Sequence, residues 1–304
     1  MSPALRAFVE RQLGAPCPPE VRAFAETLAG QAGACAALFY GSVLRTGDLG
    51  GVLDFYLLTA DRPAKGWRGW LANHLWPDVS FHQAKVADQV LRAKVATMPL
   101  STFAAAAADG FLDTTIWTRF VQPSALVFAA DPTTADTVCE AIAAASETAA
   151  RYAAALGPAG GGAEDYWQAL FRHTYAAELR VEKPGREREI IGFDPARYER
   201  LLPLAWASAG VAFSGAADDL RPRLAPAEAR RLVTAWRRRE AFGKPLNVAR
   251  LVKAAFTFEG AARYAAWKIE RHTGVVVPLT PWRERHPILA APGAAWRLWR
   301  ARRR

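Results

Sequence analysis

In the stretch FYGSVLRTGDLGGVLDFYLL, a glycine-rich connection with one serine separates two apolar runs, and a single aspartate lies inside the second run. At Gly41 the missing side chain lets the backbone approach a phosphate, and the Ser42 hydroxyl with free N–H groups can donate to phosphate oxygens. Asp54 lies inside the second run, where an ionised carboxylate is costly to bury unless a metal or a cation pairs with it. Carboxylate and phosphate oxygens are both ligands of Mg²⁺. These residues therefore indicate a phosphate site with Mg²⁺, and a salt bridge from Asp54 to a neighbouring arginine is the alternative.

The elements that must position these residues are two short buried strands. The runs ACAALFYG (34–41) and VLDFYLLTA (52–60) are rich in large apolar residues and bounded by glycines, which is typical of such strands. Apolar and charged residues alternate at helical spacing over residues 1–30, which predicts two short helices before the first strand. Further along, AKVATMP predicts a strand, followed by a helix that begins at Ser101 and Thr102.

The second half of the chain has mostly helical patterns. A long helix is predicted over residues 133–156, and it ends in GPAGGGAED, the strongest glycine-rich linker in the sequence. We therefore predict an α/β (α+β) domain with a mixed sheet at residues 1–157, and a mostly helical domain at residues 158–304.

The composition is that of a globular protein, since 51% of the 304 residues are apolar. Cys17, Cys35 and Cys139 have no CxxC spacing and indicate a reducing compartment. The N-terminus lacks the apolar core of a secretory signal, and the chain lacks an apolar run of roughly 20 residues that could span a bilayer. We expect a cytoplasmic protein whose contact with a membrane, if any, is peripheral.

A strand, then Gly-Ser at a turn, then a second strand with an aspartate is the arrangement that nucleotidyltransferases use to hold a nucleoside triphosphate. The second strand of this chain departs from their usual pattern, in which two carboxylates two residues apart face the same way. Here the second position is Tyr56. FYGSVL and VLDFYLL instead resemble motifs of the mitochondrial translocator assembly and maintenance family, whose members are peripheral phosphatidate cytidylyltransferases with one aspartate at this place. The residues that match are Tyr40, Gly41, Ser42, Asp54 and Phe55. Val43 stands where the family has a second glycine.

The resemblance continues in the same order over residues 37–190. LRAKVATMPLSTF places Lys94 at the family's lysine position, TTIWTRFVQPS places Arg119 at its arginine, and AAELRVEK aligns Glu178 and Arg180 with an acid-x-Arg pair. The C-terminal half shares with the family only a helical domain that ends in a basic, aromatic tail.

The resemblance implies a role for each of these residues. Asp54 would ligate Mg²⁺, and Glu178 would be a second metal ligand or a base. Lys94 and Arg119 would hold the triphosphate or the lipid phosphate, and the remaining nucleotide-binding residues would be Tyr40, Gly41, Ser42 and Arg180. The alternatives are a solvated charged face that Glu178 shares with its neighbours Arg180 and Glu182, and ordinary surface positions for Lys94 and Arg119.

The C-terminal tail AAWRLWRARRR alternates tryptophans with arginines. Trp296 and Trp299 are three residues apart, on one helical face, and tryptophan favours the membrane interface while arginines attract anionic headgroups at about 1 kcal/mol each. The tail therefore predicts contact with an anionic membrane. A disordered basic tail and a nucleic-acid patch are the alternatives, and we expect no nucleic-acid partner.

Together these features predict a Mg²⁺-dependent enzyme that transfers CMP from CTP to phosphatidic acid and releases pyrophosphate. One alternative is a nucleotidyltransferase that acts on another phospholipid, an isoprenoid phosphate or a protein hydroxyl. The other is a degenerate domain that binds a nucleotide or RNA without catalysis.

Overall fold

A computed structural model describes residues 1–61, 75–86, 89–178, 185–216, 218–273, 276 and 278–285. The strands are β1 (Ala34–Tyr40), β2 (Leu53–Thr59), β3 (Asp78–Val86), β4 (Gln89–Pro99), β5 (Ser124–Ala129), β6 (Ala212–Ser214) and β7 (Arg221–Arg223). The helices before residue 158 are α1 (Pro3–Leu13), α2 (Pro19–Ala32), α3 (Ser42–Thr46), α5 (Leu100–Ala107), α6 (Thr115–Phe120) and α7 (Pro132–Leu156). Those after it are α8 (Ala163–Ala177), α9 (Arg186–Gly192), α10 (Pro195–Ser208), α11 (Pro226–Thr257), α12 (Ala261–Thr273) and α13 (Pro281–Arg285).

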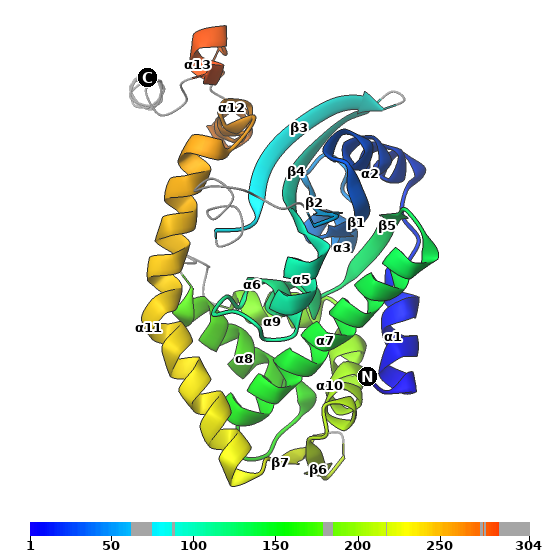
Figure 1. Ribbon diagram of the computed structural model, residues 1–304, viewed down its shortest axis with the longest axis vertical. Helices are drawn as coiled ribbons and strands as arrows, with labels where there is room; N and C mark the ends of the chain where they lie inside the picture. The colour runs from blue at the N-terminus through cyan, green and yellow to red at the C-terminus, as the bar shows by residue number, and fades with distance from the viewer. Residues whose placement is uncertain are drawn as a thin grey trace.

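The first part of the chain forms a five-stranded sheet in the order β3-β4-β2-β1-β5. β2 and β4 are parallel, and the other neighbouring pairs are antiparallel. α7, α8 and α10 lie toward the other end of the molecule, α2 and α3 lie beside the sheet, and α11 runs along one edge, with α12 and α13 beyond its end near β3 (Figure 1). The prediction of an α+β architecture with a mixed sheet and a helical C-terminal part is confirmed.

The two faces of the sheet are buried against different helices because side chains alternate along each strand. On one face, Phe39 and Phe55 pack in a cluster with Phe24 and Leu28 of α2. On the other face, the buried Tyr56 belongs to the large cluster that also contains residues of α5, α6 and α7. Side chains two residues from Tyr56 along β2, and opposite it on neighbouring strands, therefore point toward the helical end of the molecule.

The register of the sheet aligns three residues singled out from the sequence. Tyr40 at the end of β1 is paired with Asp54 on β2, and Asp54 is paired with Lys94 on β4. Paired residues on adjacent strands have their side chains on the same face. Tyr40, Asp54 and Lys94 therefore form one row across the sheet, which we call the site row.

The predicted strands at 34–41 and 52–60 are confirmed as β1 and β2, and the predicted helix at 133–156 is confirmed as α7. The helix expected to begin at Ser101 and Thr102 begins instead at Leu100, directly after Pro99, whose extended backbone conformation ends β4. β3 and β5 were not predicted.

The helical part shares a buried core with the first part. The cluster that contains Leu38 and Tyr56 of the sheet also contains Trp206 and Trp236 of α10 and α11. The division between residues 1–157 and 158–304 stays a prediction. Within the described residues, every helix is too short or too polar to cross a bilayer.

Candidate functional site

Asp54 is partly buried at the start of β2, against the backbone of Gly41. Gly41 has φ +94°, and a Cβ placed there would lie 2.6 Å from Oδ2 of Asp54. The position therefore requires glycine both for its backbone conformation and for space. Burial raises the pKa of the Asp54 carboxyl, while the positive charges of Lys94, Arg119 and Arg45 oppose that rise. Three cations thus surround one carboxylate.

Arg119 reaches the site row from α6. Its Nη1 donates to the hydroxyl of Tyr56 at 2.9 Å and to that of Tyr40 at 3.4 Å. The guanidinium also lies over both rings, 5.1 Å from the centroid of Tyr40 and 5.6 Å from that of Tyr56. Burial lowers the pKa of Arg119, but Tyr40, Tyr56, Asp54 and Glu178 raise it more, to a value above the usual one. Arg119 is therefore a fixed positive charge beside the row.

Tyr56 explains how this sheet differs from one with two carboxylates on the second strand. Its side chain is fully buried, and burial raises the pKa of its hydroxyl, so the group stays neutral. It faces the same way as Asp54 because the two are two residues apart on β2. Tyr56 therefore binds the cation Arg119, and β2 has no second acidic ligand at this position.

Glu178 directly follows α8 and is 6% exposed. Its Oε1 accepts a short hydrogen bond from Thr114 Oγ1 and a longer one, 3.5 Å, from Thr115 Oγ1. Both threonines stand at the start of α6, the helix that carries Arg119. Glu178 also contributes to the raised pKa of Arg119. The alternative of a solvated charged face is therefore wrong for Glu178, which ties α8 to the beginning of α6.

Arg45 is a further site residue that the sequence reasoning missed. It lies in the last turn of the short helix α3, between the two strands that carry Tyr40 and Asp54. Burial and the charge of Arg186 lower the pKa of Arg45, whereas Tyr198, Asp54 and Tyr175 raise it. No sequence pattern marks this arginine, because α3 is a helix of five residues inside the glycine-rich connection.

The structure brings most of the predicted site residues together. Asp54, Lys94 and Tyr40 share the site row, Gly41 touches Asp54, and Arg119 faces the row from α6. Ser42 begins α3 and is exposed. Arg180 lies outside the described residues.

The charges at the site suit a phosphate-bearing ligand that arrives with its own negative charge. Lys94, Arg119 and Arg45 outnumber the two carboxylates Asp54 and Glu178. Among the described residues, no three His, Cys, Asp or Glu side chains lie close enough to hold a metal ion by themselves. Mg²⁺ is commonly bound by one or two carboxylates together with substrate phosphates, and this donor set fits that mode through Asp54.

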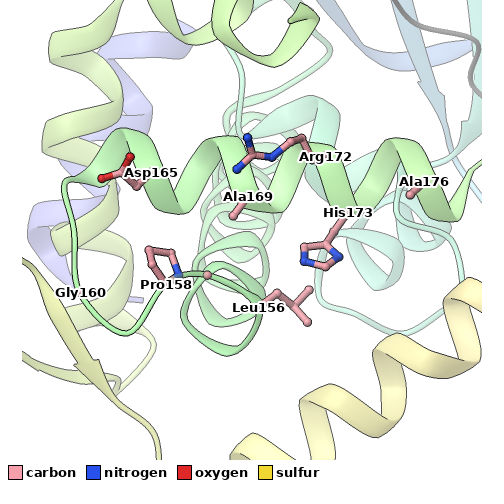
Figure 2. Close-up of a pocket in the computed structure, with 9 residues that line it drawn as sticks. Leu156, Pro158, Gly160, Asp165, Ala169, Arg172, His173 and Ala176 are labelled. Carbon is pink, nitrogen blue, oxygen red and sulfur yellow. The ribbon is translucent and has the colours of Figure 1, made fainter. Parts of the chain in front are cut away.

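A separate hollow of about 640 Å³ lies between the end of α7, the loop after it and α8 (Figure 2). It is lined by Leu156, Gly157, Pro158, Gly160, Asp165, Ala169, Arg172, His173 and Ala176. The rings of His173 and Trp236 are in edge-to-face contact, with centroids 5.8 Å apart. None of the predicted site residues lines this hollow.

The chemistry assigned to the site rests on the residues of this chain. No protein-family model matches the chain, and no curated protein matches it. The likeness of the short motifs to the cytidylyltransferase family therefore stays a proposal.

Proposed function

We propose that this protein is a nucleotidyltransferase that transfers CMP from CTP to phosphatidic acid. The observation that carries the proposal is the site row, in which Asp54 stands between Tyr40 and Lys94, with Arg119 hydrogen-bonded to Tyr40 and with the charge of Arg45 also acting on Asp54. A carboxylate for Mg²⁺ surrounded by cations for phosphates is what transfer of a nucleotidyl group requires. The mixed sheet, with the carboxylate on its central strand β2, supports a nucleotidyltransferase fold.

In the proposed reaction a phosphate oxygen of phosphatidic acid attacks the α-phosphorus of CTP. The bond from the α-phosphorus to the bridging oxygen of the β-phosphate breaks, and pyrophosphate leaves with the bonding electron pair. The products are CDP-diacylglycerol and pyrophosphate. The attacking phosphate is already ionised near neutral pH, so no side chain has to remove a proton from it, and orientation and charge neutralisation supply the catalysis.

The residues divide into those that hold the metal and those that hold phosphates. Asp54 would hold Mg²⁺, which when bound neutralises charge on the triphosphate and orients it. Lys94, Arg45 and Arg119 would bind phosphate oxygens, where charge-assisted hydrogen bonds are strongest. Glu178 would keep α6 and its Arg119 in place, and its role as a second metal ligand stays a prediction.

The test is release of pyrophosphate from CTP in the presence of Mg²⁺ and phosphatidic-acid liposomes. We expect release that needs both CTP and the lipid, with Asp54→Asn at least about 10³-fold slower because the metal loses its carboxylate. ATP, GTP and UTP test the nucleotide, and phosphatidylglycerol tests the acceptor. Release with a different acceptor would support the same transfer chemistry on another substrate. CTP binding without release under any of these conditions would contradict the proposal and leave a nucleotide-binding module.

The proposed acceptor lies in a membrane, so the protein must reach the bilayer surface. We propose that it associates peripherally. The tail with Trp296, Trp299 and the C-terminal arginines, predicted to contact the membrane, lies outside the described residues.

A further inference from the structure

In the C-terminal half of α11, large apolar side chains face solvent and polar side chains face the protein. This is the reverse of an ordinary surface helix. Val248 is 47% exposed, Leu251 59%, Val252 54% and Phe256 79%. We call these four residues the outer stripe. Leu251, Val252 and Phe256 follow Val248 by three, four and eight residues and therefore lie on one face of the helix with it. Contiguous exposed apolar surface of this kind marks an interaction site.

The opposite face of α11 is polar and is fixed to the rest of the protein. Arg250 forms a short ion pair with the buried Asp113, and its guanidinium lies 4.4 Å from the centroid of the Trp76 ring. Lys253 Nζ is 2.6 Å from Asp78 Oδ1 and donates to the carbonyl of Leu75 at 2.8 Å. Rotating the helix to bury the outer stripe would break these contacts. The stripe is therefore held outward.

The charges around the outer stripe indicate which partner fits it. Within α11, eight lysines and arginines accompany only Glu228 and Glu240, and no acidic residue follows Glu240 in the helix. Arg237, Arg238 and Lys244 are exposed and, by helical spacing, lie on the same side as the stripe. A second copy of a chain with net charge +10 would bring like charges together. An apolar stripe beside lysines and arginines complements the acyl chains and anionic headgroups of a bilayer.

We propose that the outer stripe of α11 docks on an anionic phospholipid bilayer. The apolar side chains insert at the boundary between headgroups and acyl chains, and the neighbouring arginines and lysine contact the headgroups. α11 forms one edge of the molecule along its whole length, so it can lie on a flat surface (Figure 1). The proposal deepens the proposed function. It rests on that function for one point only, that the docked enzyme reaches an acceptor that lies in a membrane.

The same helix contacts the elements of the candidate site. A Cβ at Gly243 would lie 2.6 Å from the carbonyl oxygen of Ala177, the residue before Glu178. Asp113, the partner of Arg250, accepts hydrogen bonds from the backbone N–H and hydroxyl of Thr115 at 2.9 Å each. A bilayer bound to the outer face of α11 would therefore lie one helix away from the residues that hold α6.

The experiment is sedimentation of the full chain with vesicles in the absence of CTP. Vesicles of phosphatidylcholine with phosphatidylglycerol are compared with pure phosphatidylcholine, and both lack phosphatidic acid, the proposed acceptor. The test variant is Val248→Ser/Val252→Ser/Phe256→Ser. Val90→Ser, an exposed apolar residue on β4, is the matched control. Phe256→Leu keeps an apolar side chain on the stripe.

We expect the native chain, Val90→Ser and Phe256→Leu to bind the anionic vesicles, and the triple variant to bind at least about tenfold more weakly. Binding should also weaken with added salt. Equal binding by the triple variant and the native chain, with both folded by circular dichroism, would overturn the proposal, as would failure of the native chain to bind. A native dimer that the triple variant converts to monomer would assign the stripe to a second copy instead. Pyrophosphate release from a dispersed short-chain phosphatidic acid tests the proposed function separately.

Discussion

At the scale of single residues, Asp54 is the central residue of the candidate site. Its titration predicts how the free energy of unfolding depends on pH. Burial raises its pKa in the folded protein, so the folded state keeps the proton to higher pH than the unfolded chain does. The free energy of unfolding therefore falls as the pH rises from the ordinary pKa of 3.8 through the folded-state value. Asp54→Asn abolishes this titration. We expect its melting temperature, relative to the native chain, to rise across that pH window and to be no lower at neutral pH.

Thermal melts of both proteins from about pH 3 to pH 7 measure this difference. A variant that becomes progressively less stable than the native chain as the pH rises would show that the ionised carboxylate is net stabilising. In that case the three cations around Asp54 would outweigh its burial.

A second residue-scale prediction concerns Tyr56, whose hydroxyl accepts from Arg119 at 2.9 Å. Tyr56→Phe should lower the free energy of unfolding by about 1 kcal/mol, the usual net value of one hydrogen bond. It should also slow the proposed transfer, by about tenfold, because Arg119 loses one of the groups that orient it. Tyr166→Phe is the matched control, since that buried hydroxyl donates to the carbonyl of Leu220 at 2.7 Å, away from the site row. Equal activity of the two variants would refute the positioning role of Tyr56.

Part of the candidate site was accessible from the sequence. Gly41 and Asp54 could be found because glycine before a turn and a carboxylate inside an apolar run are local signals. Arg45 could not be assigned, since a single arginine in a short polar connection has no pattern of its own. The function of Tyr56 was equally hidden, because its partner Arg119 is 63 residues away in the chain.

At the scale of elements, the contact between α11 and α8 predicts the effect of two matched substitutions. Gly243→Ala adds a Cβ 2.6 Å from the backbone oxygen of Ala177, which cannot move without shifting the end of α8. Alanine is favoured over glycine in a helix by roughly 1 kcal/mol, but overpacking against backbone costs about 1–3 kcal/mol. We expect net destabilisation, measured by urea unfolding. Gly30→Ala in α2, where a Cβ meets nothing within 4 Å, should instead stabilise. Stabilisation by both would mean that the helices separate at little cost.

The strands that the sequence did not reveal show why elements were missed. Most side chains of β3 are exposed or partly buried, so its sequence lacks the apolar run of a buried strand. β5 follows α6 without a glycine to mark where the strand begins. α11 continues through Pro245, although a proline inside a helix ordinarily breaks or kinks it. The helix is anchored on both sides of the proline, by Arg239 to Asp109 and by Arg250 to Asp113. Such tertiary contacts can outweigh the roughly 3 kcal/mol that proline costs inside a helix.

At the scale of the whole molecule, the shared core predicts how a fragment behaves. α7 packs against α8, α10 and α11, and its Tyr152 is in ring contact with Trp236 of α11. A fragment of residues 1–157 would expose that apolar face to water. We expect it to aggregate or to lose cooperative unfolding, as measured by light scattering and urea titration, whereas the full chain unfolds in a single transition. A soluble, cooperatively folded fragment would confirm the division at residue 157.

The strand order also determines when each strand can pair with its neighbours during synthesis on the ribosome. β1 has β2 as one neighbour, only a short connection away, but its other neighbour β5 begins at Ser124. Until that segment emerges, one edge of β1 has unpaired backbone groups that another nascent chain can join. Arg119, whose charge acts on Asp54, and Glu178, which binds the start of α6, emerge later than the strands that carry Tyr40, Asp54 and Lys94. The sheet is therefore a late-closing structure with many contacts between distant residues, and such topologies fold slowly compared with helical bundles.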